Sequence, residues 1–300
     1  MSDVVGFVGG SGIYESLPLS DTREEELSTP YGEPSAPITV GELGDTGREV
    51  AFVPRHGRNH EYSPTEVPYR ANVHALKQLG VRHVIASNAV GSLREDVPPR
   101  TLVVPDQVFD RTRHREYSFF GDGVVVHQGF AEPYAPELSA ILVEAAREAT
   151  GADAGGDGDG DGTGVVDGGT YVCIEGPQFS TRAESEFYRS NGWDVVGMTT
   201  VPEAKLAREA EMAYATVAGV TDYDVWRTDA AVSLEEVLEN AAANETAIRE
   251  TVEAAVRAIP LDEEWPCHSA LAGTVNTPSE AIPPATRERV DLLLGEYLDD

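Results

Sequence analysis

A short positive segment is the first feature of the sequence that could do chemistry. Residues 54–60 read Pro-Arg-His-Gly-Arg-Asn-His, without a carboxylate, in a chain that has 22 Lys plus Arg against 52 Asp plus Glu. The guanidinium fork of Arg55 suits phosphate because it donates two parallel hydrogen bonds. His56 and His60 could instead hold a metal, but a His-x-x-x-His pair without further ligands is a weak signal. We therefore favour anion binding by this segment.

Two carboxylates separated by one residue form a second candidate. Asp222 and Asp224 directly follow the apolar run 213–220. Strand periodicity points side chains at i and i+2 toward the same side. At the end of a sheet, such a pair could share a proton or hold a nitrogenous base. A solvated turn is the alternative, because Asp is common in turns.

Two further turns follow strand-like runs. Gly-Gly-Ser-Gly at 9–12 could present backbone N–H groups and the Ser11 hydroxyl to an anion, although a tight turn explains it equally well. It matches neither the Walker loop nor the dinucleotide fingerprint. Ser-Asn-Ala-Val-Gly-Ser at 87–92 leaves a buried strand at the edge where ligands gather in open α/β sheets. A plain polar exit from the strand explains this second turn equally well.

Strands that alternate with helices must position these clusters. Helices are expected over 65–79, 134–149, 181–191 and, as one long amphipathic helix, 234–259. Strands are expected over 4–8, 37–43, 48–53, 81–87, 101–104, 165–174, 194–196 and 213–220. This alternation predicts an α/β fold, a single domain with a mixed, largely parallel twisted sheet flanked by helices. We expect this domain to span residues 1–260, with residues 261–300 packing on it as a C-terminal extension.

Residues 151–164 differ in composition from everything around them. The segment has seven Gly, four Asp and no large apolar residue. It cannot bury enough surface to offset the entropy of ordering, so we expect an acidic, Gly-rich surface insertion. A calcium loop beginning at Asp157 would need a bidentate Glu at its twelfth position, where Gly168 stands.

The overall composition excludes several function classes. A net charge of −30 argues against binding nucleic acid or an anionic membrane, because both are held by clustered Lys and Arg. The spread of acidic residues is typical of a protein that lives at very high salt. We expect a cytoplasmic protein, because no signal peptide or apolar membrane span is recognisable and Cys173 and Cys267 have no metal or redox spacing.

The clusters together resemble the purine nucleoside phosphorylase and methylthioadenosine phosphorylase family. They occur in the family's order and spacing from about residue 4 to residue 258. The matching stretches are 9–12, 54–58, 91–95 (Gly-Ser-Leu-Arg-Glu), 106–107 (Asp-Gln), 175–184 (Glu-Gly-Pro-Gln-Phe-Ser-Thr-Arg-Ala-Glu), 198–203 (Met-Thr-Thr-Val-Pro-Glu) and 221–226 (Thr-Asp-Tyr-Asp-Val-Trp). The combination is highly specific.

The resemblance implies a role for individual positions. The implied phosphate site consists of Ser11, Arg55, His56, Asn88, Ala89 and Thr199. The implied nucleoside site consists of Phe179 stacking on the purine, Met198 along the ribose, Val196, Asp222, Asp224, Leu234 and Val237. Members of the family assemble as homotrimers or homohexamers, and His127 matches a position that reaches into the neighbouring subunit's site. The implied reaction uses inorganic phosphate and a purine nucleoside, and needs neither a metal nor an organic cofactor.

Three positions favour methylthioadenosine as the substrate within this resemblance. Family members that take 6-oxopurines resemble one another in having Asn at the position of Asp222, Glu at Ser180 and a His that contacts the 5′-hydroxyl at Leu234. An aspartate can accept from a 6-amino group and share a proton with N7, and an apolar residue suits a 5′-methylthio group. Two positions depart from the family, since Asn88 replaces the usual Thr and Gly197 replaces the Asn of the animal enzymes.

The implied mechanism is a single displacement in which phosphate attacks C1′ from below the ribose. Asp222 would neutralise the departing purine at N7, Asp224 would orient Asp222 or accept from the base, and His56 would help to hold phosphate. The alternatives are a 6-oxopurine or methylthioinosine phosphorylase, a nucleoside hydrolase and an acidic binding protein without enzymatic activity.

Overall fold

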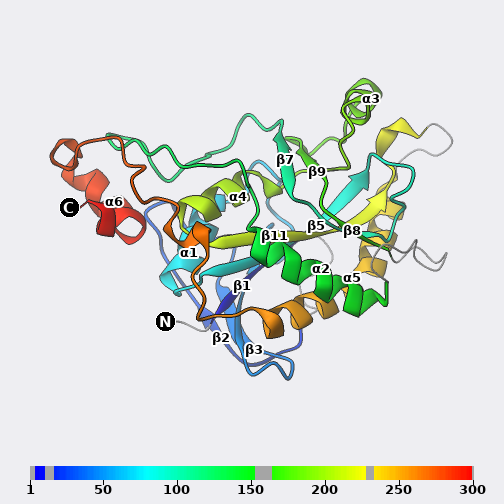
Figure 1. Cartoon of the computed structure of the whole chain (residues 1–300), viewed down its shortest axis with the longest axis horizontal. Coiled ribbons are helices and arrows are strands. Elements are labelled where there is room, and N and C mark those ends of the chain that lie inside the picture. Colours follow the sequence, from blue (N-terminus) through cyan, green and yellow to red (C-terminus); the bar gives the residue numbers. More distant parts are fainter. Residues whose placement is uncertain (1–3, 11–16, 153–163, 228–232, 299–300) are drawn as a thin grey trace.

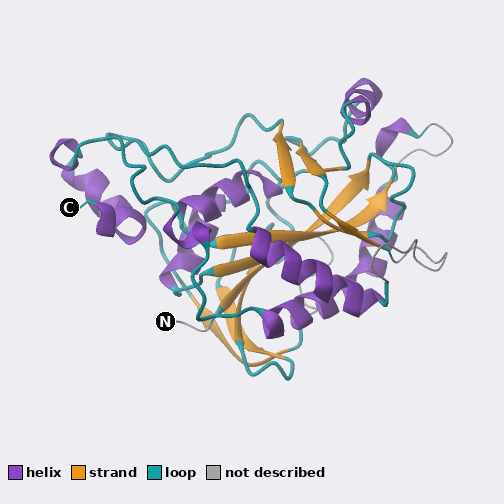
Figure 2. Ribbon diagram, viewed as in Figure 1, coloured by secondary structure: helices purple, strands orange, loops and turns teal. Residues whose placement is uncertain are grey.

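The described residues of the chain form an eleven-stranded mixed sheet with helices on both faces (Figures 1 and 2). The computed structural model describes residues 4–10, 17–152, 164–227 and 233–298. The strands are β1 (Val5–Gly9), β2 (Leu19–Glu25), β3 (Ile38–Leu43), β4 (Glu49–Pro54), β5 (His83–Ser92), β6 (Leu102–Val104), β7 (Gln107–Asp110), β8 (Val165–Asp167), β9 (Thr170–Cys173), β10 (Val195–Gly197) and β11 (Ala213–Asp222). The α-helices are α1 (Tyr69–Gln78), α2 (Pro136–Thr150), α3 (Arg182–Ser190), α4 (Thr200–Glu209), α5 (Leu234–Ala258) and α6 (Pro284–Leu294). The expected fold class is confirmed.

The strand order explains how distant segments come together. Neighbours run β2-β3-β4-β1-β5-β10-β9-β7, and β11 joins β5 to β6, which in turn pairs with β8. The two longest strands, β5 and β11, run parallel along almost their whole length, from the pair His83 and Ala213 to the pair Gly91 and Asp222. Their carboxyl ends therefore lie side by side, which is where open α/β sheets form ligand sites.

Alternating side chains of the central strands supply two separate cores. Val5 and Phe7 of β1 pack in one core together with α2 and α5, whereas Val4 and Val8 pack in the other with α1 and α4. This alternation follows from the two-residue period of a strand. Figure 1 shows α2 and α5 lying side by side on their face of the sheet, in agreement with their contacts. Burial on both faces holds the strand ends in fixed positions.

Residues beyond α5 add a small core of their own. Leu271, Ile282, Val290, Leu294 and Leu298 cluster around Val124, and Leu293 joins the core on the side of α1 and α4. Figure 1 places α6 at the left end of the molecule, well away from α3. The C-terminal segment thus packs on the loop that follows β7.

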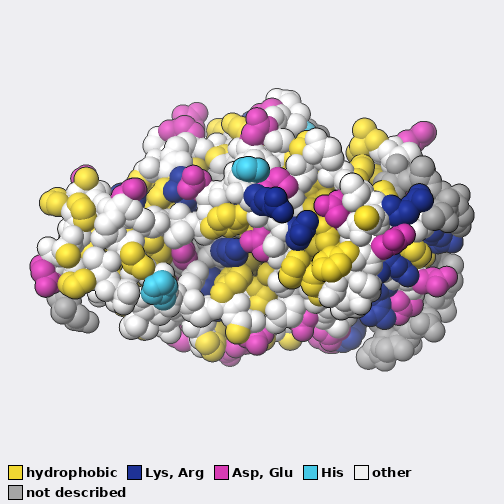
Figure 3. Space-filling view, turned by 90° about the horizontal axis from the view of Figure 1, so that it is seen from above, with side chains coloured by type: hydrophobic (Ala, Val, Ile, Leu, Met, Phe, Trp, Pro, Cys, Tyr) yellow, Lys and Arg dark blue, Asp and Glu magenta, His cyan; other side chains and the backbone are white. Residues whose placement is uncertain are grey.

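Acidic side chains are spread over the molecular surface. Figure 3 shows Asp and Glu distributed across the visible face, with Lys and Arg in smaller groups between them. None of the helices within the described residues combines the length and apolar composition that crossing a bilayer would require.

Candidate functional site

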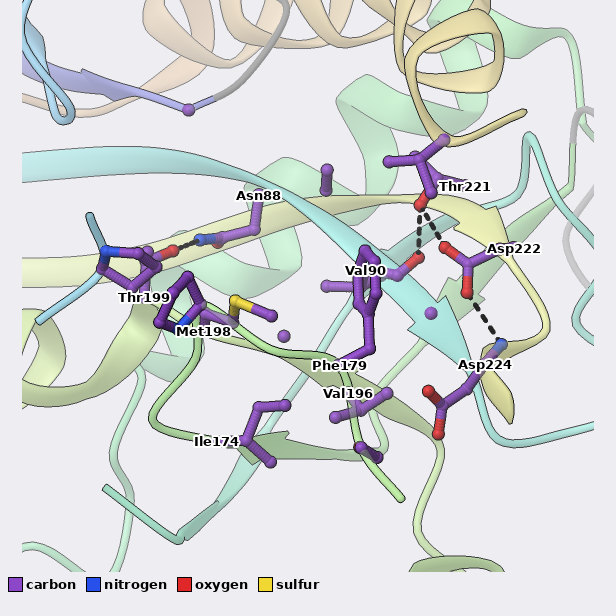
Figure 4. Close-up of a pocket in the computed structure, with 18 of the residues that line it drawn as sticks. Asn88, Val90, Ile174, Phe179, Val196, Met198, Thr199, Thr221, Asp222 and Asp224 are labelled. Atoms are coloured by element: carbon purple, nitrogen blue, oxygen red, sulfur yellow. Dashed lines mark hydrogen bonds between the residues drawn. The ribbon is translucent and has the colours of Figure 1, made fainter. Parts of the chain in front are cut away.

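A cavity of about 240 Å³ lies at the carboxyl ends of β5, β10 and β11. Eleven of the expected site residues line it: Arg55, His56, Asn88, Ala89, Phe179, Val196, Met198, Thr199, Asp222, Asp224 and Val237. Figure 4 shows Asn88 and Thr199 at one end of it and Asp222 and Asp224 at the other. The residues expected to bind an anion and the pair of aspartates are far apart in sequence, but they line one cavity.

Three other expected residues stand apart from this lining. Ser11 lies outside the described residues. Leu234 is 66% exposed and does not line the cavity, because it opens α5 on the solvent side of the helix while Val237, one turn later, faces inward. His127 is exposed and also lies outside the cavity of its own chain, on a segment whose backbone N–H donates to the carbonyl of Thr274.

Arg55, expected to bind phosphate, is buried beside the cavity and is already paired. Its Nε and Nη2 each donate to the carboxylate of Glu203 at 2.8 Å, and Nη1 donates to the carbonyl of Ser87 at 2.9 Å. Burial lowers the pKa of Arg55, but the Glu203 carboxylate outweighs burial and the pKa lies above its ordinary value. A guanidinium has five N–H groups, so two are left for a ligand after these three bonds. These bonds hold the Arg55 side chain in place, and the carboxylate of Glu203 on α4 neutralises its charge.

His56 sits beside Arg55 as a neutral imidazole. Burial, and then the charge of Arg55, lower the pKa of His56 to about 4. Its Nδ1 lies 2.8 Å from the carbonyl of Tyr62, which only accepts, so this nitrogen carries the proton. Nε2 is then an acceptor, suited to a protonated oxygen of phosphate. His60 stacks on the His56 ring at 4.6 Å. No group of three or more potential metal ligands occurs within the described part of the chain.

A hydrogen-bonded chain orients the hydroxyl of Thr199. The Thr216 hydroxyl lies within hydrogen-bonding distance of Asn88 Oδ1, which fixes the amide so that Nδ2 donates to Thr199 Oγ1 at 2.7 Å. Because Thr199 Oγ1 accepts this bond, its own proton remains available for a second acceptor. Asn88, which stands where the family usually has Thr, is thus held by Thr216 and in turn holds the hydroxyl of Thr199.

The two aspartates at the other end are held differently from each other. Asp222 ends β11 and accepts from the Thr221 hydroxyl and the Asp224 N–H, both at 2.8 Å. Asp224 has left the strand, with φ of 51°, so strand periodicity does not bring the two together. A tight turn brings the two aspartates together instead. Gly91 packs closely against them, because a Cβ at this position would lie 2.9 Å from Asp222 Oδ1.

Burial changes the protonation of both carboxyls. It raises the pKa of Asp222, and it raises the pKa of Asp224 to about 6. Among the described residues, no partner forms a hydrogen bond of good geometry with the buried Asp224 Oδ2 or with the hydroxyl of Ser180, which also lines the cavity. Buried polar atoms of this kind are costly unless a ligand satisfies them. This end of the cavity can therefore hold or protonate a nitrogen heterocycle.

Apolar side chains fill the wall between the two ends. Phe179 is 47% exposed at the mouth, and Val196 and Met198 line the cavity beside it (Figure 4). A Cβ at Gly176, whose φ is 68°, would lie 2.6 Å from the Met198 sulfur, so the loop that carries Phe179 passes tightly over Met198. The wall suits a flat ring and a sugar face.

Two charged residues that support the site were not among the sequence candidates. Glu203 neutralises Arg55, and Arg115 donates to the backbone carbonyls of Met198 and Val201. Glu203 lies 148 residues from its partner, and no local pattern signals such a pair. Arg115 belongs to the run Arg-Thr-Arg-His-Arg at 111–115, a second positive segment that could have been noticed.

Comparison with known proteins agrees with this geometry. The chain is 46% identical to the S-methyl-5′-thioadenosine phosphorylase of Koribacter versatilis, with 100% of this chain and 98% of that protein covered. It is 48% identical to the protein of the same name from Chloroflexus aurantiacus, with 99% of each covered.

Solved structures give the same result. A methylthioadenosine phosphorylase from an Antarctic soil metagenomic library superposes with a TM-score of 0.88 at 45% identity, over 98% of this chain and 99% of that one. A Schistosoma mansoni methylthioadenosine phosphorylase in complex with tubercidin has a TM-score of 0.78 at 38% identity, over 88% and 93%. A family model described as the phosphorylase superfamily matches residues 4–257, and the chain therefore belongs to the phosphorylase superfamily.

Proposed function

We propose that this protein is a pentosyltransferase that converts S-methyl-5′-thioadenosine and inorganic phosphate into adenine and 5-methylthioribose 1-phosphate. The proposal rests on one observation. A single cavity has hydrogen-bond donors for an anion at one end and, at the other, the carboxyls of Asp222 and Asp224, whose pKa values are raised. Relatives that share nearly half of its residues over their full length bear the name of this activity.

At the anion end, phosphate accepts hydrogen bonds from the two remaining N–H groups of Arg55 and from Thr199, with Ser11 and the Ala89 backbone as further contacts. His56 Nε2 accepts the proton of a phosphate hydroxyl and so orients the anion. These groups are fixed by Glu203 and Asn88 before phosphate binds, so little reorganisation is needed. Positioning of the nucleophile supplies much of the catalysis in such a reaction.

At the base end, a phosphate oxygen forms a bond to C1′ while the bond from C1′ to the purine nitrogen breaks. The electron pair of that bond stays on the purine, whose N7 takes the proton of the Asp222 carboxyl. Burial raises the pKa of Asp222 and so increases its protonated fraction. Asp224, which also lines the cavity, accepts from the 6-amino group through Oδ2. Phe179 stacks on the purine, and Met198 and Val196 contact the ribose.

The 5′ end of the nucleoside faces an apolar pocket. Val237 lines the cavity, whereas Leu234, at the start of the same helix, is exposed and would contact the methylthio group only if the start of α5 moved inward. We further propose a homotrimer or homohexamer in which His127 of one copy reaches the cavity of its neighbour, since this side chain is exposed and does not line the cavity of its own chain. The acidic surface fits a cytoplasmic protein at high salt, and purine salvage with recovery of the methylthio group is the role that this reaction serves.

A phosphate-dependence assay on a nucleoside panel tests the proposal. Purified protein in molar potassium chloride is given methylthioadenosine, methylthioinosine, adenosine or inosine, with and without phosphate, and base release is followed by absorbance. We expect fast release from methylthioadenosine only when phosphate is present. Robust turnover of inosine would instead favour a 6-oxopurine enzyme, and release without phosphate would indicate a hydrolase.

A further inference from the structure

A second buried arginine lies behind the wall of the cavity. Arg115 follows β7 in the chain, its side chain is 0% exposed, and it does not line the cavity. Burying a guanidinium is costly unless its N–H groups are satisfied. Arg115 satisfies them mostly with backbone carbonyls, which belong to the loop after β9 and to the segment formed by the loop after β10 and the start of α4.

One side of the Arg115 fork holds the loop that follows β9. Nε donates to Glu175 Oε1 at 3.1 Å and Nη2 donates to the Glu175 carbonyl at 2.7 Å. The Glu175 carboxylate is itself fixed by the hydroxyl of Thr65 at 2.6 Å and by the N–H of His114 at 3.1 Å. This loop continues to Phe179, in the apolar wall of the cavity.

The other side of the fork holds the loop that follows β10. Nη1 donates to the carbonyls of Met198 and Val201, both at 2.6 Å. These two carbonyls bracket Thr199, the residue whose hydroxyl points to the phosphate end. Nη1 also lies 3.3 Å from the hydroxyl of Tyr69. The guanidinium of Arg115 therefore connects the backbone of the loop that leads to Phe179 with the backbone on both sides of Thr199.

We propose that Arg115 is a positioning residue that couples phosphate binding to nucleoside binding. The inference rests on the proposed function, because it assigns Thr199 to phosphate and Phe179 to the base. When phosphate fixes the backbone at Thr199, the fork of Arg115 is fixed with it, and the loop at Glu175 loses less freedom when the base binds. Coupling of this kind is reciprocal, so adenine tightens phosphate binding by the same factor.

A lysine cannot replace this fork. An ammonium is a single donor centre that could keep the ion pair with Glu175 but could not reach Met198 and Val201 at the same time. Arg115→Lys thus preserves the charge and removes the connection. Arg48 offers a matched control, because its Nη1 also donates to two backbone carbonyls, those of Val256 and Ile259 at 2.5 and 2.6 Å, at the end of α5.

The experiment measures the dissociation constant of inorganic phosphate by calorimetry, with and without saturating adenine, in the wild type, Arg115→Lys and Arg48→Lys. We expect adenine to tighten phosphate binding about 5-fold or more in the wild type and in Arg48→Lys, and less than 2-fold in Arg115→Lys. Equal coupling in all three proteins would overturn the inference. Turnover of methylthioadenosine by the wild type is measured in parallel, and its absence would instead count against the proposed function.

If Arg115→Lys does not fold, a milder variant tests whether Arg115 couples phosphate binding to adenine binding. Tyr69→Phe removes one contact of Nη1 and leaves the arginine in place, and Tyr69 does not line the cavity. Reduced coupling in Tyr69→Phe with unchanged thermal stability supports the inference. Unchanged coupling in this variant contradicts it.

Discussion

In the proposed mechanism, Asp222 is the side chain that protonates the leaving purine. Its carboxyl is buried, accepts two hydrogen bonds and has a raised pKa. Asp222→Asn keeps the shape but removes the proton donor, so we expect kcat for methylthioadenosine to fall about 10²–10⁴-fold. Steady-state kinetics at saturating phosphate measure this. Asp194→Asn, which alters a buried aspartate that accepts from the Thr170 N–H outside the cavity, should leave kcat within 3-fold, about 0.6 kcal/mol.

Asp224 makes the stability of the free protein depend on pH in a defined direction. Burial raises its pKa from 3.8 to about 6, so the folded state holds this proton more tightly than the unfolded state. The stability that the neutral carboxyl contributes is full below pH 3.8 and is lost as pH rises through 6. Asp224→Asn cannot lose it. We therefore expect the melting temperature of the variant, relative to wild type, to rise between pH 4 and pH 7. A difference that does not change with pH would contradict this assignment.

In the proposed mechanism, a single carboxylate on helix α4 holds the arginine that binds phosphate. Glu203 of α4 neutralises Arg55, and Tyr214 donates to Glu203 at 2.8 Å. Glu203→Gln leaves the arginine charge buried and unpaired, which costs about 3–5 kcal/mol of unfolding free energy. Phosphate can then supply the missing negative charge. We expect added phosphate to raise the melting temperature of Glu203→Gln more than that of the wild type. Equal shifts in scanning calorimetry would show that phosphate does not contact Arg55.

The elements that sequence patterns predict well are those with apolar periodicity. The runs at 4–8 and 213–220 became β1 and β11, and the long amphipathic pattern from 234 became α5. Strand β2 (Leu19–Glu25) escaped prediction because it is an exposed edge strand without apolar alternation. Helix α4 escaped because Pro202 interrupts its start, where Val201 has non-helical angles.

In the site, too, residues marked by a local sequence pattern were predicted and residues that meet only in space were not. Motifs located Arg55 and Asp222 because glycines, histidines and paired carboxylates mark them locally. The partners Glu203 and Arg115 could not be assigned in this way, since their roles arise only when β10, α4 and the loop after β7 meet in space. The start of the helix from 65 was placed too early because Pro64 and Pro68 delay α1 until Tyr69.

At the scale of the whole molecule, charge is the dominant property. A net charge of −30 repels itself at low ionic strength, and also repels phosphate from the cavity. Screening shortens the reach of these charges from about 10 Å at 0.1 M salt to about 3 Å at 1 M. We expect the melting temperature to rise and the KM for phosphate to fall between 0.1 and 1 M potassium chloride. Sucrose at equal osmolality is the control, and a matching response to sucrose would argue against charge screening.

The most direct test of one cavity that holds phosphate and nucleoside at opposite ends is the stereochemistry of the product at C1′. Protein, methylthioadenosine and phosphate are incubated together and the sugar product is identified by phosphorus and proton magnetic resonance. Direct displacement predicts inversion, so the product is the α-anomer of 5-methylthioribose 1-phosphate, formed in equal amount with adenine. A β-anomer, or free methylthioribose with no consumption of phosphate, would contradict the account.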